Sequence, residues 1–211
     1  MIPTSLTLVG CGAYARELIN WIADATAAGS LPPLTGFLDT TSNSLDNFPY
    51  TLVYRGRIED YVPEPGEALV MAIASPEAKR RIASELKAKG ASFATVIHPS
   101  AVIAGSARLG EGVTVCPFAL ISADATVGEF AAINAMSSIG HDVQLGAYAT
   151  LSAHVDLTGR VVVGSEAFFG TGAKVLPGVK IGERAKIGAG ALIMRSVKAD
   201  VVMYAAPAKQ L

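Results

Sequence analysis

A strict period of six residues governs half of this chain. Every sixth residue from Ile97 to Ile193 is large and apolar, and four residues after each of them comes Ala, Val or Ser. The series comprises Ile97, Ile103, Leu109, Val115, Ile121, Val127, Ile133, Ile139, Leu145, Leu151, Leu157, Val163, Phe169, Val175, Ile181, Ile187 and Ile193. Neither an α-helix nor an alternating strand repeats every six residues, whereas a parallel β-helix of hexapeptide repeats does. With three units closing one coil, the series predicts roughly five to six coils.

The first 95 residues follow a different pattern, in which strands alternate with helices. We expect strands at 5–9, 34–38, 68–74 and 91–97, and helices at 14–28 and from Pro76 to near Gly90. Ser75 and Pro76 suit the N-cap and first position of the second helix. That helix should bury Ile82 and Leu86 and turn its charged residues outward, namely Lys79, Arg80, Arg81, Glu85 and Lys87. The alternation predicts a small Rossmann-like parallel sheet, so we expect an α/β domain over residues 1–95 and a β-helix domain with a C-terminal tail over 96–211.

A glycine-rich loop follows the first strand. Gly10, Gly12 and Ala15 match the G-x-G-x-x-G/A pattern, and Asp39 ends the next strand. Three interpretations stay open: a dinucleotide site, a tight turn that needs glycine for its backbone alone, or a helix N-terminus that receives another nucleotide-type ligand. In the third, Asp39 would bond a base or a ribose.

Composition excludes several other functions. The net charge of −1 gives no electrostatic basis for binding nucleic acid or a membrane surface. The apolar run at 68–74 is far shorter than a membrane span, and we expect no secretion signal. Cys11 and Cys116 fall in different predicted domains, so we expect free, packed thiols and a reducing cytoplasm.

Three histidines are the candidate catalytic or metal-binding groups. We expect His98, beside Pro99, to be structural. His141 takes an outward hexad position and precedes Asp142, a carboxylate that can set its tautomer and basicity. His154 would fall on another face of the coil, so one chain offers no close histidine pair for zinc, and we predict no metal.

At this point the residues resemble a known family over nearly the whole chain. The carriers of the resemblance are Leu8-Val9-Gly10-Cys11-Gly12, Gly36-Phe37-Leu38-Asp39, Ala72-Ile73-Ala74, Val96-Ile97-His98-Pro99-Ser100-Ala101, Ile133-Asn134, Ile139-Gly140-His141-Asp142 and Pro207-Ala208-Lys209. Together they resemble the sialic-acid and bacillosamine type of sugar acyltransferases, which includes N-acetyltransferases of nucleotide-linked 4-amino sugars such as perosamine. The resemblance implies a left-handed β-helix, acetyl-CoA as co-substrate and a homotrimer with sites at its interfaces.

The resemblance also implies residue roles. His141 looks like the general base that deprotonates the sugar amine as it attacks the thioester, and Asp142 looks like the neighbour that raises its proton affinity. Positions matching substrate contacts are Gly12, Ala13, Tyr14, Asp39, Thr40, Ala74 and Asn134. Positions matching acetyl-CoA contacts are Thr150, Thr171 and Ala189.

The sequence departs from the family at several of these positions. Ala13-Tyr14 stands where Gly-His is frequent, Ala74 where glycine is frequent, and Thr150 where histidine is common. From the resemblance as a whole, the leading hypothesis is N-acetylation of a nucleotide-linked 4-amino-4,6-dideoxy sugar. Sugar O-acetylation, transfer from another acyl-CoA, a non-catalytic assembly subunit and a zinc lyase are the alternatives.

Overall fold

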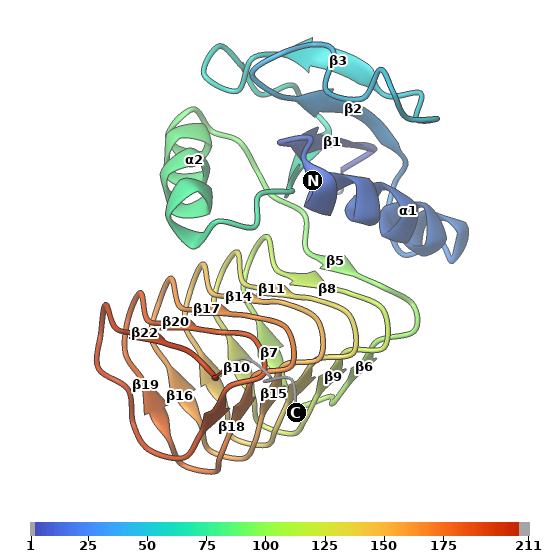
Figure 1. The fold of residues 1–211 in the computed structure, drawn as a ribbon. Coiled ribbons are helices and arrows are strands. Elements are labelled where there is room, and N and C mark those ends of the chain that lie inside the picture. Colours follow the sequence, from blue (N-terminus) through green and yellow to red (C-terminus); the bar gives the residue numbers. More distant parts are fainter. Residues whose placement is uncertain (1–2, 207–211) are drawn as a thin grey trace.

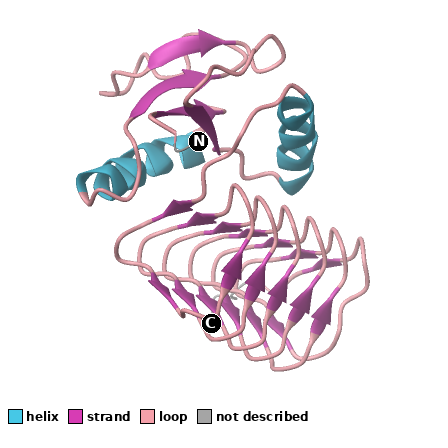
Figure 2. Cartoon of the chain, turned by 180° about the vertical axis from the view of Figure 1, so that it is seen from behind, coloured by secondary structure: helices cyan, strands magenta, loops and turns pink. Residues whose placement is uncertain are grey.

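The structure, a computed structural model, describes residues 3–206 and consists of an α/β unit seated on a β-helix (Figures 1 and 2). The α/β unit has one parallel sheet in the order β3-β2-β1-β4. Its strands are β1 (Ser5–Val9), β2 (Leu34–Leu38), β3 (Val53–Gly56) and β4 (Glu67–Met71), and its helices are α1 (Ala13–Ala27) and α2 (Pro76–Ala88). The predicted strands at 5–9 and 34–38 are confirmed, and so are Ser75 as the N-cap of α2 and Pro76 as its first residue.

Three strand predictions need correction. The strand expected at 68–74 is β4, which begins at Glu67 and ends at Met71. The short edge strand β3 was not predicted, because its four residues are half exposed and carry no long apolar run. The strand expected at 91–97 shrinks to β5 (Val96–Ile97), and Phe93 makes only an isolated bridge to Leu69.

The two helices cover opposite faces of this sheet. Leu6 and Leu8 of β1 pack with Leu18 and Ile22 of α1. Val9 of the same strand instead packs with α2, whose Ile82 and Leu86 are buried as predicted. The alternation of side chains along a strand therefore gives each helix its own small core.

The β-helix has three parallel sheets, which we call faces 1, 2 and 3. Face 1 contains β5, β8 (Thr114–Val115), β11 (Ala132–Ile133), β14 (Thr150–Leu151), β17 (Phe168–Phe169), β20 (Lys186–Ile187) and β22 (Val202–Met203). Face 2 contains β6 (Val102–Ile103), β9 (Leu120–Ile121), β12 (Ser138–Ile139), β15 (Asp156–Leu157), β18 (Lys174–Val175) and β21 (Leu192–Ile193). Face 3 contains β7 (Arg108–Leu109), β10 (Thr126–Val127), β13 (Gln144–Leu145), β16 (Val162–Val163) and β19 (Lys180–Ile181).

The predicted hexad positions form the interior of this left-handed parallel β-helix. The residues of the series from Val115 to Ile193 are buried, together with the Ala, Val and Ser residues that follow them by four. Ile97, Ile103 and Leu109 in the first coil are only partly buried. Glycine follows many hexad residues because the coils approach closely there: a Cβ on Gly128 would lie 2.5 Å from the backbone nitrogen of Ala147.

The end of the chain extends the β-helix further than expected. The period stops at Ile193, but β22 pairs in parallel with β20 and adds a strand to face 1. Pro207, Ala208 and Lys209, which carry part of the family resemblance, lie outside the described residues.

The α/β unit packs on face 1 and on the corner between faces 3 and 1. Phe93 meets Phe130 edge to face at 4.8 Å, and Phe130 stacks on Tyr148 at 5.4 Å. Lys87 of α2 bridges Glu111 and Glu129 of the β-helix at 2.8 and 2.9 Å. The prediction that Lys79 points outward is wrong, since this lysine is only 1% exposed. The pattern of a lone helix cannot show that a second domain will cover its charged side.

Candidate active site

His141 and Asp142 form a hydrogen-bonded pair on the open surface of the β-helix. Nδ1 of His141 lies 2.8 Å from a carboxylate oxygen of Asp142, and both side chains are more than half exposed. Asp142 has a positive φ of 59°, a conformation that aspartate tolerates better than most residues. A carboxylate on Nδ1 favours the tautomer that leaves Nε2 free to accept a proton, so the pair has the arrangement of a general base and its orienting acid.

The other ring nitrogen of His141 lies over Gly159 of the next coil. β12 pairs with β15, so residue 141 stands directly beside residue 159. A Cβ on Gly159 would overlap Nε2 and would lie 2.6 Å from Cε1. Gly159 thus provides the space that the imidazole occupies, and the family resemblance had not singled it out.

The pair of His141 and Asp142 lies far from the α/β unit of the same chain. His141 follows β12 of face 2 and precedes β13 of face 3, so it projects from the corner between these faces. In a three-faced solenoid that corner lies opposite face 1, where the α/β unit sits. Within one chain, the pair and the predicted substrate loops are therefore on opposite sides of the β-helix.

The glycine-rich loop and Asp39 meet at the carboxyl ends of β1 and β2. Gly10 has φ +88°, and a Cβ there would lie 2.8 Å from Cγ1 of Ile73, so the turn itself requires this glycine. Gly12 is the N-cap of α1 without a side-chain cap, and a Cβ on it would meet nothing within 4 Å. The geometry of the turn requires glycine at position 10 but not at position 12. A glycine at position 12 is instead typical of a ligand close to the exposed N-terminus of α1.

Asp39, Thr40 and Ala13 border the same loop. The Asp39 carboxylate accepts a hydrogen bond of 2.7 Å from the backbone nitrogen of Thr40. Ala13 and Thr40 are exposed, and Asp39 is half-buried. These three residues therefore remain accessible to a ligand at the edge of the sheet.

Tyr14, also predicted to contact substrate, has its side chain engaged elsewhere. Its hydroxyl lies 2.7 Å from Oγ1 of Thr114 on face 1 and 4.0 Å from Sγ of Cys116. Burial raises the pKa of this phenol well above its ordinary value. The side chain anchors α1 to the β-helix, so only the backbone of Tyr14 is available at the loop.

Ala74 and Thr150, predicted for different ligands, are brought into contact. Oγ1 of Thr150 donates to the carbonyl oxygen of Ala74 at 2.8 Å and accepts from Nζ of Lys79 at 3.0 Å. The Thr150 side chain is thereby covered by the α/β unit rather than open to a coenzyme. The sequence analysis did not identify Lys79 as part of this contact. The available signal was its position in the first turn of a helix that begins with proline.

Asn134, Thr171 and Ala189 share the corner between faces 1 and 2. Each follows a strand of face 1: β11, β17 and β20, respectively. Oδ1 of Asn134 accepts from the backbone nitrogen of Ala135 at 2.6 Å, while Thr171 and Ala189 are exposed. The predicted coenzyme residues thus lie on face 1 or its corner with face 2, and His141 and Asp142 do not.

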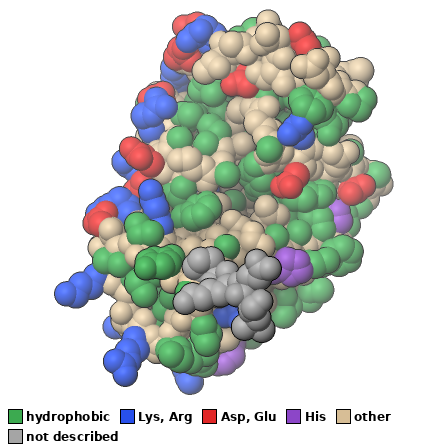
Figure 3. Space-filling view, in the orientation of Figure 1, with side chains coloured by type: hydrophobic (Ala, Val, Ile, Leu, Met, Phe, Trp, Pro, Cys, Tyr) green, Lys and Arg blue, Asp and Glu red, His purple; other side chains and the backbone are tan. Residues whose placement is uncertain are grey.

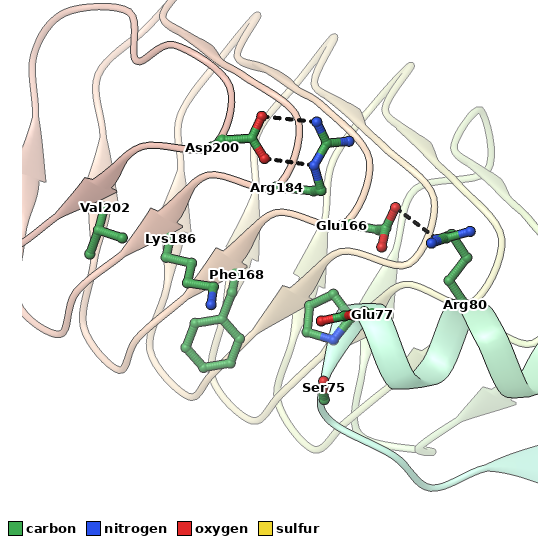
Figure 4. A pocket seen from close by; sticks show the side chains of 10 residues that line it. Ser75, Glu77, Arg80, Glu166, Phe168, Arg184, Lys186, Asp200 and Val202 are labelled. Atoms are coloured by element: carbon green, nitrogen blue, oxygen red, sulfur yellow. Dashed lines mark hydrogen bonds and ion pairs between the residues drawn. The ribbon is translucent and has the colours of Figure 1, made fainter.

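A cavity of about 610 Å³ opens beyond the start of α2, over the later coils of face 1 (Figure 4). It is lined by Ser75, Pro76, Glu77, Arg80, Glu166, Phe168, Arg184, Lys186, Asp200 and Val202. Arg80 pairs with Glu166 at 3.0 Å, and Arg184 pairs with Asp200 through two contacts of 2.7 and 2.9 Å. Phe168 and Lys186 follow Thr150 in the outward row of face 1, so the cavity adjoins the contact between Thr150 and Ala74.

The remaining histidines and the two cysteines lie apart from the pair of His141 and Asp142. His98 contacts Ser100 at 2.7 Å and Asp24 at 3.2 Å, as its expected structural role requires. His154 projects from the corner between faces 1 and 2, away from His141. Cys11 and Cys116 are free and buried, and burial raises the pKa of both thiols to about 12.

Among residues 3–206, no three His, Cys, Asp or Glu side chains are grouped to hold a metal ion. None of the helices in this range has the length and apolar character of a membrane span.

Comparisons with known proteins define the class. The bacterial transferase hexapeptide family (six repeats) matches residues 160–195. No curated protein sequence matches the chain. The repeat and the β-helix place the chain among the hexapeptide-repeat transferases.

Solved structures narrow the class further. Perosamine N-acetyltransferase from Caulobacter crescentus, solved with CoA and GDP-perosamine, is 32% identical, with 97% of this chain and 96% of that chain covered and a TM-score of 0.84. WeeI from Acinetobacter baumannii AYE is 25% identical, with coverages of 94% and 96% and a TM-score of 0.79. The acetyltransferase domain of PglB from Neisseria gonorrhoeae FA1090, with acetyl coenzyme A, is 24% identical with coverages of 99% and 100% and a TM-score of 0.87, which shows a shared fold. The chain belongs to the sugar acyltransferase family that includes perosamine N-acetyltransferase.

Proposed function

We propose that this protein transfers the acetyl group of acetyl-CoA to the amino group of a nucleotide-linked 4-amino-4,6-dideoxy sugar. The observation that carries the proposal is the exposed His141–Asp142 pair, at 2.8 Å, on a chain of this family. The identity of 32% to a perosamine N-acetyltransferase solved with CoA and GDP-perosamine supports this substrate class.

The chemistry requires a base and no covalent enzyme intermediate. Nε2 of His141 takes a proton from the sugar amine as its nitrogen attacks the thioester carbonyl carbon. The new C–N bond forms, the C–S bond breaks, and CoA leaves as a thiolate that recovers the proton from His141. Asp142 holds Nδ1 throughout and stabilises the imidazolium. Both buried cysteines stay protonated near neutral pH, so neither is suited to be the nucleophile.

The two parts of the chain divide the binding of the two substrates. Residues 1–95 hold the nucleotide sugar: the backbone amides of Gly12, Ala13 and Tyr14 at the start of α1 meet the diphosphate, and Asp39, Thr40 and Ala74 border it. Residues 96–211 supply the acyltransferase part. Asn134 lies near the sugar, and Thr171 and Ala189 mark the coenzyme's course along the corner of faces 1 and 2, whereas the side chain of Thr150 is covered by the α/β unit.

The position of His141 supports a homotrimer. The base lies on the corner of faces 2 and 3, whereas the substrate loops and coenzyme positions lie on face 1 and its corner with face 2. In the proposed trimer, the corner between faces 2 and 3 of one chain meets the corner between faces 1 and 2 of the next chain. Every site is then completed by a neighbour, and such head-to-tail contacts close into a ring of three.

Exposed apolar side chains lie where this contact requires them. They gather on face 2 and its corner with face 1, along the side of the β-helix that carries β6 and β9 (Figure 3). They include Val102, Phe118, Leu120, Met136 and Leu192, which are 42–64% exposed. Large exposed apolar surfaces mark contacts between proteins.

Thiol release from acetyl-CoA tests the proposal. We expect turnover with nucleotide-linked 4-amino sugars, a product whose new acetyl group is amide-bound by mass spectrometry, and a trimer by light scattering. Turnover with hydroxyl acceptors only would replace N-acetylation by O-acetylation. No turnover with either acceptor class would leave the chain a non-catalytic subunit.

A further inference from the structure

One lysine connects the two parts of the chain from inside their contact. Lys79 lies in the first turn of α2, is 1% exposed and has no ion pair among residues 3–206. Nζ donates to the carbonyl oxygen of Ala149 at 3.2 Å and to Oγ1 of Thr150 at 3.0 Å. A buried amine without a carboxylate is costly, and burial lowers the pKa of Lys79 to about 7.

The hydrogen bonds around Lys79 have a fixed direction. Since Lys79 donates to Oγ1 of Thr150, the hydroxyl proton of Thr150 points to the carbonyl oxygen of Ala74, 2.8 Å away. Ala74 lies in the loop between β4 and α2, and Thr150 lies in β14 of face 1. The chain from Lys79 through Thr150 to Ala74 thus ties this loop to one coil of the β-helix.

We propose that Lys79 is a positioning residue that, acting through Thr150, holds the Ala74 loop where the nucleotide sugar binds. This inference rests on the proposed function, because it assigns the Ala74 loop to the sugar side of the site. Lys79 touches neither substrate; it sets the distance between the loop of the α/β unit and the coil that carries Thr150.

A stability role alone is a poor explanation, because both acceptors keep other partners without Lys79. The carbonyl oxygen of Ala149 also accepts from the backbone nitrogen of Ala132 at 2.9 Å. The hydroxyl of Thr150 can still donate to Ala74 without Lys79, but its proton is then no longer held in that direction. Replacing Lys79 by the similarly long, apolar Met therefore leaves no buried backbone group unpaired, and the fold should tolerate it.

The test is steady-state kinetics of Lys79→Met, Thr150→Val and the double variant. We expect Lys79→Met to raise KM for the nucleotide sugar about tenfold while KM for acetyl-CoA and the melting temperature change little. Because both single variants break one chain of bonds, the double variant should raise KM for the sugar no further than Thr150→Val does. Arg81→Met is the matched control, since Arg81 lies on the exposed side of α2 and pairs only with Glu85 among residues 3–206.

The outcomes separate this inference from the proposed function. An active wild type and a folded Lys79→Met variant with the wild-type KM for the sugar would overturn the inference and leave the function standing. Multiplying effects in the double variant would also overturn it, because Lys79 would then not act through Thr150. Should Lys79→Met not fold, Thr150→Val alone must still raise KM for the sugar. A wild type without turnover would remove both proposals.

Discussion

The imidazole of His141 fills the space above Gly159, one coil further along the β-helix, so that a Cβ at position 159 would overlap Nε2. The atoms nearest to that Cβ all belong to the His141 side chain, and Gly159 has no positive φ. The closest overlap of a methyl group there is with the ring, which must move to admit it.

Gly159→Ala should therefore lower kcat without unfolding the protein. A shift of the base by about 1 Å can cost up to 100-fold in rate, so we expect a loss of about 10- to 100-fold with a nearly unchanged melting temperature. Gly105→Ala is the control, because a Cβ there meets nothing within 4 Å. Equal activity of Gly159→Ala and wild type would show that the ring position seen here is not the productive one.

Replacing His141 by Asn should remove general-base catalysis. General-base catalysis contributes about 10²- to 10⁴-fold, so kcat should fall within that range while coenzyme binding persists. An unchanged kcat in folded His141→Asn, measured by thiol release, would contradict the assignment of the base.

Asp142→Asn should slow acetyl transfer less than loss of His141 does. A hydrogen bond to a charged group is worth about 1.5–3 kcal/mol, which corresponds to a loss of about 10- to 100-fold in kcat. Asparagine keeps the left-handed backbone that Asp142 adopts, so the fold is preserved. Asp124→Asn, at φ 60° one coil earlier on the same corner, should leave kcat as in the wild type.

Gly12 and Gly10 should respond differently to alanine. Gly12→Ala has no steric cost in the free protein, so a rise of about tenfold in the Kd of the nucleotide sugar, by calorimetry, would report a close ligand. Gly10→Ala should instead lower the melting temperature, because of its positive φ and the overlap with Ile73. Unchanged sugar binding in Gly12→Ala would leave the loop as a turn.

The buried amine of Lys79 makes stability depend on pH. Its pKa of about 7 lies below that of a free lysine, about 10.4, so between these values the unfolded chain binds one more proton than the native one. The free energy of unfolding should then rise with pH, by at most about 1.4 kcal/mol per unit. The rise should show between about pH 7 and 8.5, below the range where the cysteine thiols of the unfolded chain ionise.

Lys79→Met should lack this rise. Urea unfolding of the wild type and of Lys79→Met at several pH values gives the difference between their free energies of unfolding. The contributions of titrating groups that both proteins share cancel in this difference. Parallel curves for the two proteins would mean that Lys79 keeps its proton in the fold.

The sequence by itself determined the β-helix, because its period of six repeats a local requirement: an apolar side chain inside, a small one at the corner, and glycine where coils touch, as at Gly128. It also determined β1, β2 and both helices, whose apolar spacing and caps are local. It marked the pair of His141 and Asp142 as outward, because position in a hexad fixes direction.

Only the tertiary structure decided what each position faces. Lys79 resembles any charged surface residue in its helix, yet face 1 buries it. Tyr14 stands at the start of α1, beside the glycine-rich loop, yet its hydroxyl bonds Thr114, a hundred residues away. His141 and the loops proposed to bind substrate lie on opposite sides of one chain. The coil turns the chain by one face every six residues, while the α/β unit packs only on face 1 and its corner with face 3. Such relations depend on contacts between distant segments, which no local spacing encodes.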